Sequence, residues 1–183
     1  MRFRRTFIFV DLSGFTTFTE QHGDGTAAQL LSKFRAVARA VGSHQGVRID
    51  KYLGDGLMAV AVEAHDGITF AMELQRHAAV ACAPLSLRIG IASGDTMLFE
   101  GQDYIGWAPN MAARLCDAAS GVGALLPAEQ AVNLPVGLTA LGHPPVELPG
   151  FNGLVEVVAL AGEPLIDGRY DINEVLLGAP FVS

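Results

Sequence analysis

Strand-like and helix-like patterns of hydrophobic residues alternate from the start of the chain. A short apolar run at residues 5–12 predicts a buried strand. From Gly25 onward, apolar residues recur every three or four positions until Gly46. This second pattern predicts an amphipathic helix that the glycine ends.

Two further strand-like runs, at 47–53 and 57–62, flank the sequence Gly54-Asp55-Gly56. A short glycine-rich turn between two such runs is typical of a β-hairpin. The other predicted elements are a helix at 66–82, a strand at 85–92 that Ser93-Gly94 would end, a partner strand at 96–99, a helix at 107–119 with Pro109 in its first turn, and short strands at 123–126, 146–148 and 155–160.

This order predicts one α/β domain whose core runs strand-helix-strand-strand-helix-strand. A chain of 183 residues has about the length of one domain. Half of its residues are hydrophobic and 17% are charged, which excludes disorder. We expect a single domain over 1–183, with a core at about 5–160 and a C-terminal tail at 161–183.

Charge and cysteine content exclude several classes of protein. The formal net charge is −7, so binding of long nucleic acid is not expected. No apolar run reaches the roughly 18 residues of a membrane span, and the apolar stretch after the basic start is too short for a signal peptide. We therefore expect a cytoplasmic protein without a membrane span. Cys82 and Cys116 lack C-x-x-C spacing, so we expect two buried thiols in a reducing compartment.

Asp11 is the first candidate for chemistry, because it directly follows the apolar residues Phe7–Val10 and so places a carboxylate at the end of the predicted strand 5–12. The residues after it, Leu12-Ser13-Gly14-Phe15-Thr16, include a glycine and small polar side chains that leave backbone N–H groups free to face an anion. The alternative is an aspartate that only caps the next helix.

Asp55 is the second candidate and gains its meaning from Asp11. Neighbouring strands lie about 4.8 Å apart, so carboxylates at two strand ends can converge on a hard divalent cation.

Lys51 is the third candidate, because it is one of only two lysines and lies in a mostly apolar strand. The alternative is an edge-strand lysine that prevents aggregation.

The segment from Asp103 to Arg114 is the fourth candidate. Asn110 and Arg114 are four residues apart in a predicted helix and therefore share one face. An amide and a guanidinium that face the same way suit a ribose and a phosphate. The alternative is a solvated helical face.

Together these segments resemble the catalytic domain of class III nucleotidyl cyclases. The resemblance covers about 5–160 and rests on Phe9–Thr16, Lys51–Ala59, Arg88–Gly94, Asp103–Arg114 and the late segment Leu148–Phe151. It implies a ferredoxin-like βαββαβ core with extra C-terminal strands. It also implies a head-to-tail homodimer with two shared active sites.

The resemblance further implies a role for each candidate residue. Asp11, the backbone carbonyl of Leu12 and Asp55 would hold two divalent cations, Mg²⁺ or Mn²⁺. Lys51 and Asp103 of the other protomer would read the base, while Asn110 orients the ribose and Arg114 meets the phosphates. The implied enzyme is an adenylate cyclase, a phosphorus–oxygen lyase that makes the signal molecule cyclic AMP from ATP.

The base can also be argued from hydrogen-bonding edges. Adenine presents an acceptor at N1 and a donor at N6, which match a lysine and an aspartate. Guanine has the opposite polarity, so Lys51 and Asp103 favour ATP. The alternatives are a guanylate cyclase, a catalytically silent domain that binds nucleotide or regulates a partner, and a plain interaction domain.

The sequence departs from the family in two places. The arm between Gly94 and Asp103 is shorter, which would weaken the dimer, and Pro149 replaces a late lysine.

Overall fold

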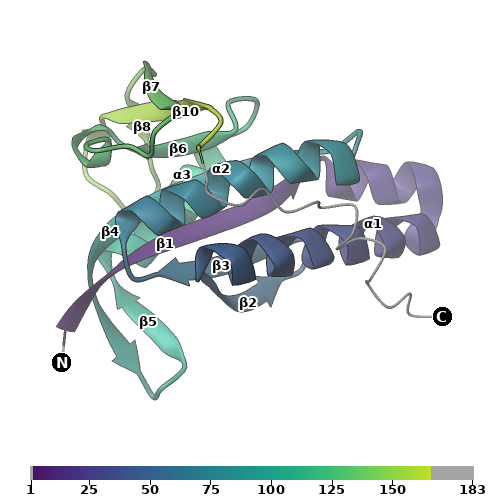
Figure 1. Cartoon of the computed structure of the whole chain (residues 1–183), viewed down its shortest axis with the longest axis horizontal. Coiled ribbons are helices and arrows are strands. Elements are labelled where there is room, and N and C mark those ends of the chain that lie inside the picture. The colour runs from purple at the N-terminus through teal and green to yellow at the C-terminus, as the bar shows by residue number, and fades with distance from the viewer. Residues whose placement is uncertain (1, 166–183) are drawn as a thin grey trace.

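The expected order of core elements is present in the structure, a computed structural model that describes residues 2–165 (Figure 1). The elements are β1 (Arg2–Ser13), α1 (Phe15–Gln45), β2 (Arg48–Leu53), β3 (Gly56–Ala61), α2 (Ala64–Ala81), β4 (Ser86–Phe99), β5 (Asp103–Gly106), α3 (Trp107–Ala118), β6 (Ala124–Pro127), the 3₁₀ turn η1 (Ala128–Gln130), β7 (Leu138–Gly142), β8 (Val146–Glu147), β9 (Leu154–Val155) and β10 (Val157–Gly162). The expected C-terminal tail lies, from residue 166 on, outside the described residues.

One mixed sheet forms the centre of the fold, in the order β2-β3-β1-β4-β6-β10-β7. Its first four strands are antiparallel to their neighbours, which is the ferredoxin-like arrangement expected from the sequence. β6 runs parallel to β4, and β5 forms a hairpin with the second half of β4. The extra C-terminal strands are therefore confirmed, and β7 is one that the sequence pattern did not predict.

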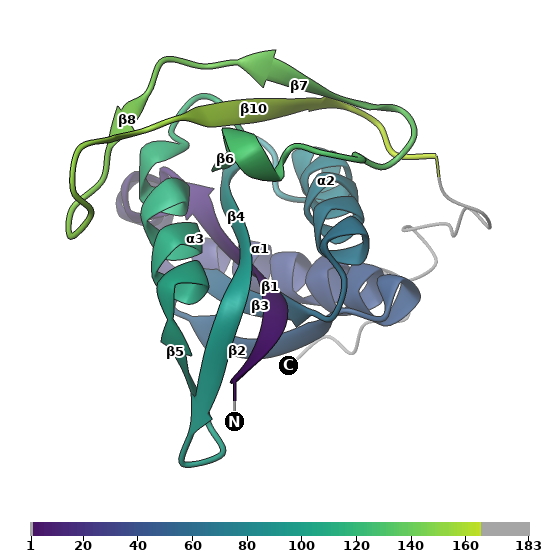
Figure 2. The ribbon, with the colours of Figure 1, turned by 90° about the vertical axis from the view of Figure 1, so that its left-hand side faces the viewer.

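The two faces of this sheet carry separate hydrophobic cores. Ile8, Val10 and Leu12 of β1 pack toward α1 and α2, whereas Phe7 and Phe9 pack toward α3. Figure 2 shows α3 on one side of β4 and α2 on the other. We call these the α1/α2 face and the α3 face. Because side chains alternate along a strand, β1 brings Asp11 to the α3 face.

Helix α1 consists of two helical segments that meet at a kink at Gly23, whose backbone leaves the helical region at φ 81°. The segment after the kink agrees with the helix predicted from Gly25, and the sequence pattern did not predict the first segment, which begins at Phe15. Phe18 is buried in the core of the α1/α2 face, so tertiary packing maintains this first segment. The residues Phe15 and Thr16 therefore lie in the first turn of a helix.

Strand β4 is longer than expected, and the prediction that Ser93-Gly94 ends it is wrong. Ser93 pairs with Thr6 of β1, and their hydroxyl oxygens lie 2.7 Å apart. The side chain of Gln130 bonds both the N–H and the carbonyl of Ser93 at 2.7 and 2.9 Å. These distant partners let the strand continue to Phe99, so residues 96–99 belong to β4 and their partner is β5.

Helix α3 lies directly on β4 because Gly90 has no side chain. A Cβ at this position would come within 2.0 Å of the carbonyl oxygen of Ala112 and 2.3 Å of the amide nitrogen of Cys116. The Sγ of Cys116 also donates to the carbonyl of Arg88 at 3.3 Å. This close approach fixes α3, and with it Asn110 and Arg114, over the centre of the sheet.

Candidate functional site

Asp11 lies at the end of β1 between two strands that both contribute to its surroundings. Its Cα pairs with Gly56 of β3 on one side and with Arg88 of β4 on the other. Arg88 donates two hydrogen bonds to Oδ2 of Asp11, one of them from Nε at 3.1 Å. The reading of Asp11 as a helix cap is therefore wrong, because the N-cap of α1 is Gly14.

Asp55 occupies the turn between β2 and β3, next to Asp11. A Cβ at Gly56 would lie 3.2 Å from Oδ1 of Asp11, so this oxygen points toward the turn that carries Asp55. Burial raises the pKa of Asp55 above its ordinary value of 3.8, and the negative charge of Asp11 raises it further. Asp11 and Asp55 are therefore neighbours, and their convergence on a cation stays a prediction.

The donor set fits a divalent cation that is completed by a ligand. Residues 2–165 contain no group of three or more His, Cys, Asp or Glu side chains able to hold a metal. Mg²⁺ needs no such cage, because one or two carboxylates with substrate phosphates commonly suffice. Oδ1 of Asp11 and the partly buried carboxylate of Asp55 have the chemistry of such a pair of ligands, and two adjacent negative charges would gain from a cation between them.

The first turn of α1 lies immediately beyond Asp11. Gly14 is the N-cap with a left-handed backbone (φ 83°), and no side chain caps the turn. An uncapped helix N-terminus directs backbone N–H groups and a partial positive charge outward. The expected phosphate-facing residues Ser13, Gly14, Phe15 and Thr16 thus lie beside the two carboxylates, while the side chain of Leu12 is buried in the opposite face.

Lys51 and Asp103 are far apart in sequence but in contact in the fold. Nζ of Lys51 donates to Oδ1 of Asp103 at 2.7 Å, which joins β2 to β5. This bond is the main cause that raises the pKa of Lys51 above 10.5. β2 is also the edge strand of the sheet, so a role of Lys51 in protecting that edge agrees with the same structure.

Asn110 and Arg114 lie on the solvent side of α3, as their spacing predicted. Asn110 donates to the carbonyl of Gly106 at 3.1 Å, and Arg114 lies 3.6 Å from Asp117. Both contacts lie within α3 or at its start. They agree with a role in binding ribose and phosphate, and they agree equally with a solvated helical face. The late segment packs nearby, because the ring of Phe151 stands edge-on to Trp107 at 6.4 Å.

Four residues join this site that the sequence reasoning did not single out. Arg88 pairs with Asp11, and Arg48, Asp50 and Tyr104 surround Lys51 and Asp103. The contacts of Arg88 with Asp11 and of Arg48 with Tyr104 join different strands, so no spacing along the chain reveals them, whereas Asp50 contacts Arg48 and Lys51 within β2. The only sequence signal is that Arg88 interrupts the apolar strand 85–92.

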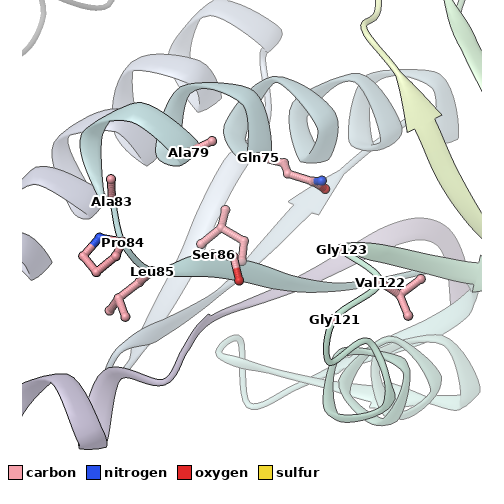
Figure 3. A pocket seen from close by; sticks show the side chains of 10 residues that line it. Gln75, Ala79, Ala83, Pro84, Leu85, Ser86, Gly121, Val122 and Gly123 are labelled. Carbon is pink, nitrogen blue, oxygen red and sulfur yellow. The ribbon is translucent and has the colours of Figure 1, made fainter.

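A cavity of about 430 Å³ lies elsewhere, between the end of α2, the start of β4 and the loop Gly121–Gly123 (Figure 3). Among the described residues, its lining includes no predicted site residue. Cys82 is also outside the site, whereas Cys116 lies next to Arg88. Burial raises the pKa of Cys82 to about 11 and that of Cys116 to about 12, so both are buried thiols, as expected.

The β4–β5 hairpin and the start of α3 expose large hydrophobic side chains next to Asp103. Between 38% and 50% of the surface of each is accessible in Met97, Leu98, Phe99, Ile105 and Trp107. Several exposed apolar side chains on one arm are typical of an interaction surface. No helix within residues 2–165 combines the length and the apolar character needed to cross a membrane.

Solved structures identify the class of fold as that of nucleotide cyclase catalytic domains. The adenylyl cyclase CyaB from P. aeruginosa matches with a TM-score of 0.73 and 22% identity, over 93% of this chain and 97% of that chain. The guanylate cyclase domain of RhGC from Catenaria anguillulae, in complex with GTP, matches with a TM-score of 0.76 and 16% identity, over 89% and 99%. The chain thus has a cyclase fold that adenylyl and guanylyl cyclases share.

The relatives found by sequence do not add an activity. An uncharacterized protein of Mycobacterium tuberculosis, Rv2212, is 34% identical over 156 residues, which cover 85% of this chain and 41% of that protein. The chain therefore spans about two fifths of the length of this relative. No protein-family model matches the chain.

Proposed function

We propose that this chain is the catalytic domain of an adenylate cyclase, which converts ATP to 3′,5′-cyclic AMP and pyrophosphate at sites shared between two copies. One observation carries the proposal, namely that the domain brings its candidate residues together in pairs. Asp11 neighbours Asp55, and Lys51 hydrogen-bonds Asp103. Helix α3 of the same domain presents Asn110 and Arg114. The cyclase fold alone agrees equally with a guanylate cyclase.

Two divalent cations, Mg²⁺ or Mn²⁺, would be held by Asp11, Asp55 and the backbone carbonyl of Leu12. When bound, such ions lower the pKa of the ribose 3′-hydroxyl and neutralise charge on the triphosphate. Arg88 supports this arrangement because it occupies Oδ2 of Asp11 and leaves Oδ1 available on the side of Asp55.

The triphosphate and the ribose would contact residues of two helices, α1 and α3. The free N–H groups in the first turn of α1 bind phosphate oxygens. In the reaction, the 3′-oxygen forms a bond to the α-phosphorus, the bond to pyrophosphate breaks, and the hydroxyl proton passes to water. Arg114 stabilises the charge that develops on the α-phosphate, and Asn110 orients the ribose for in-line attack.

The base is chosen by Lys51 and Asp103. Without nucleotide these two side chains satisfy each other at 2.7 Å. With adenine between them, Lys51 donates to N1 and Asp103 accepts from the N6 amine. Guanine would place a donor against the lysine and an acceptor against the aspartate, which leaves polar groups unpaired.

A second copy of the chain would enclose this site. The side chain of Asp103 is 67% exposed and that of Arg114 47% exposed, too open for strong stabilisation of a transition state. The exposed apolar residues of the β4–β5 hairpin adjoin Asp103 and suit burial against another chain. In the proposed dimer, Lys51 and Asp103 of one protomer face Asp11 and Asp55 of its partner. Asn110 and Arg114 come from the same protomer as Lys51.

The direct test is to incubate the protein with ATP and Mn²⁺ and to quantify cyclic AMP by mass spectrometry, with GTP in a parallel reaction. We expect cyclic AMP as the main product and a specific activity that rises with protein concentration. The variant Asp11→Ala serves as the inactive control. Faster formation of cyclic GMP would favour a guanylate cyclase, and nucleotide binding without any cyclic product would favour a silent binding domain.

A further inference from the structure

Strand β2 contains an irregularity at Asp50, directly before Lys51. Ile49 pairs with Ala59 of β3, but Lys51 pairs with Met58, the very next residue. Asp50 is therefore an extra residue without its own partner on β3. Such a β-bulge changes the direction of the side chains that follow it.

The bulge decides which face of the sheet receives Lys51. Ile49 and Tyr52 both pack against the core of the α1/α2 face, although they are three residues apart. In a regular strand, residues three apart point to opposite faces. The extra residue removes this conflict, and Lys51 pairs with Met58, which belongs to the core of the α3 face.

The carboxylate of Asp50 is also in contact with the charged groups around it. Its side chain is only 9% exposed. Oδ1 accepts a hydrogen bond from Arg48, and Oδ2 lies 3.8 Å from Nζ of Lys51. Arg48 in turn donates to the hydroxyl of Tyr104 at 2.7 Å. Asp50 thus lies between Arg48 and Lys51. Arg48 contacts Tyr104 of β5, and Lys51 contacts Asp103 of the same strand.

We propose that Asp50 is a positioning residue for base recognition, which turns Lys51 to the α3 face and holds its ammonium beside Asp103. Arg48 completes the arrangement because it orients Asp50 and ties it to Tyr104. The inference rests on the proposed function, since it assigns the preference for adenine partly to a residue that does not touch the base.

The competing explanation is protection of a sheet edge. A lysine and a bulge on an edge strand both prevent pairing with other chains. Under that explanation the carboxylate of Asp50 has no influence on nucleotide choice. The charge of Asp50 is therefore the feature to change, while the bulge stays in place.

The first experiment compares Asp50→Asn with the wild type, because asparagine keeps the size of the side chain and removes its charge. We expect the ratio of kcat/KM for ATP to that for GTP to fall about tenfold, mainly through a higher KM for ATP. Asp24→Asn, at an exposed position of α1, is the matched control and keeps the wild-type ratio. Asp50→Glu restores part of the ratio, because it returns the charge.

A double-mutant comparison separates positioning from a general structural effect. In a Lys51→Ala background, Asp50→Asn should change the ATP/GTP ratio by less than about twofold, because the group that Asp50 positions is gone. An equal fall in both backgrounds overturns the proposal, and so does an unchanged ratio in the wild-type background.

A second measurement needs no activity. The chain has two lysines, so ¹⁵N-lysine labelling gives one ammonium signal for Lys51 and one for Lys33 as an internal control. We expect Asp50→Asn to speed the exchange of the Lys51 protons with water severalfold and to leave Lys33 unchanged. An unchanged Lys51 overturns the proposal. If the wild type makes no cyclic nucleotide, the proposed function fails, while this measurement still decides whether Asp50 holds Lys51.

Discussion

The two faces of the central sheet use the same strands for different purposes. On the α1/α2 face, β1 contributes Ile8, Val10 and Leu12 to an apolar core that two helices cover. On the α3 face, the alternate positions Phe7 and Phe9 are also apolar, but the series ends with Asp11. Both faces therefore have an apolar core, but the α3 face also carries charge near the end of its covering helix.

The difference also appears in how charged groups are satisfied. The side chains of Asp11, Arg88 and Lys51 on the α3 face are between 22% and 36% exposed and pair with residues of other strands. Partly open ion pairs contribute little to folding stability. Substitutions there should consequently affect chemistry far more than stability, whereas the reverse is expected for the α1/α2 face.

The largest expected effect comes from the two carboxylates. Asp11→Ala and Asp55→Ala should each reduce cyclic AMP formation to less than about a tenth of the wild-type rate, because each removes a proposed metal ligand. Circular dichroism should show an intact fold in both variants. A variant that keeps more than this rate contradicts the metal assignment.

The matched change on the other face is Leu74→Ala in α2, at a side chain that is fully buried. It should lower the free energy of unfolding by about 2–5 kcal/mol, because it leaves a cavity in the core. The folded fraction should keep its specific activity. A selective loss of activity without loss of stability would remove the contrast between the two faces.

The next effect concerns base choice on the α3 face. Replacing Lys51 with Glu and Asp103 with Cys should lower kcat/KM for ATP roughly thirty- to a thousand-fold, because both matched hydrogen bonds are lost. GTP should be affected much less, because Glu accepts from guanine N1–H. If the ATP/GTP ratio stays within about threefold of the wild type, Lys51 protects the sheet edge and does not read the base.

The smallest expected effect is a gain in stability from Asp55→Asn. The folded protein binds a proton at Asp55 more tightly than the unfolded chain, since burial and Asp11 raise this pKa above 3.8. The contribution of Asp55 to stability is therefore largest below pH 3.8 and is lost as the pH rises through the raised pKa. Without metal at pH 7, the ionised carboxylate destabilises the fold.

Thermal unfolding in EDTA checks this sign. Asp55→Asn should raise Tm by about 1–3 °C at pH 7, and the difference should vanish toward pH 3. Added Mg²⁺ should stabilise the wild type more than the variant, because a ligand that binds only the folded state raises Tm. A lower Tm for the variant at pH 7 would show that Asp55 stabilises the metal-free fold.

The sequence predicted the elements whose signals are local. The helix from 66, the helix from 107 and the hairpin around Gly54-Asp55 agree with the structure, because periodicity and turn residues suffice to indicate them. The errors lie where distant contacts decide. Burial of Phe18 stabilises the helical segment that precedes the kink at Gly23, and Gln130 satisfies the backbone of Ser93 so that β4 continues.

The site shows the same division. Asp11 and Asp55 could be paired from the sequence because their strands are neighbours in the predicted fold, and the contact of Lys51 with Asp103 follows the resemblance. Arg88 and Asp50 could not be predicted, since a cross-strand ion pair and a bulge depend on register. Register is set by the hydrophobic faces of both strands together and not by one segment alone.

The central claim is that one active site takes residues from two copies of the chain, and mixing two inactive variants tests it most directly. Asp11→Ala and Arg114→Ala should each be inactive alone. In their heterodimer, one interface carries both substitutions and the other carries neither, so cyclic AMP formation should return when the variants are combined. No recovery, under conditions where mass spectrometry shows that subunits exchange, would contradict the shared site.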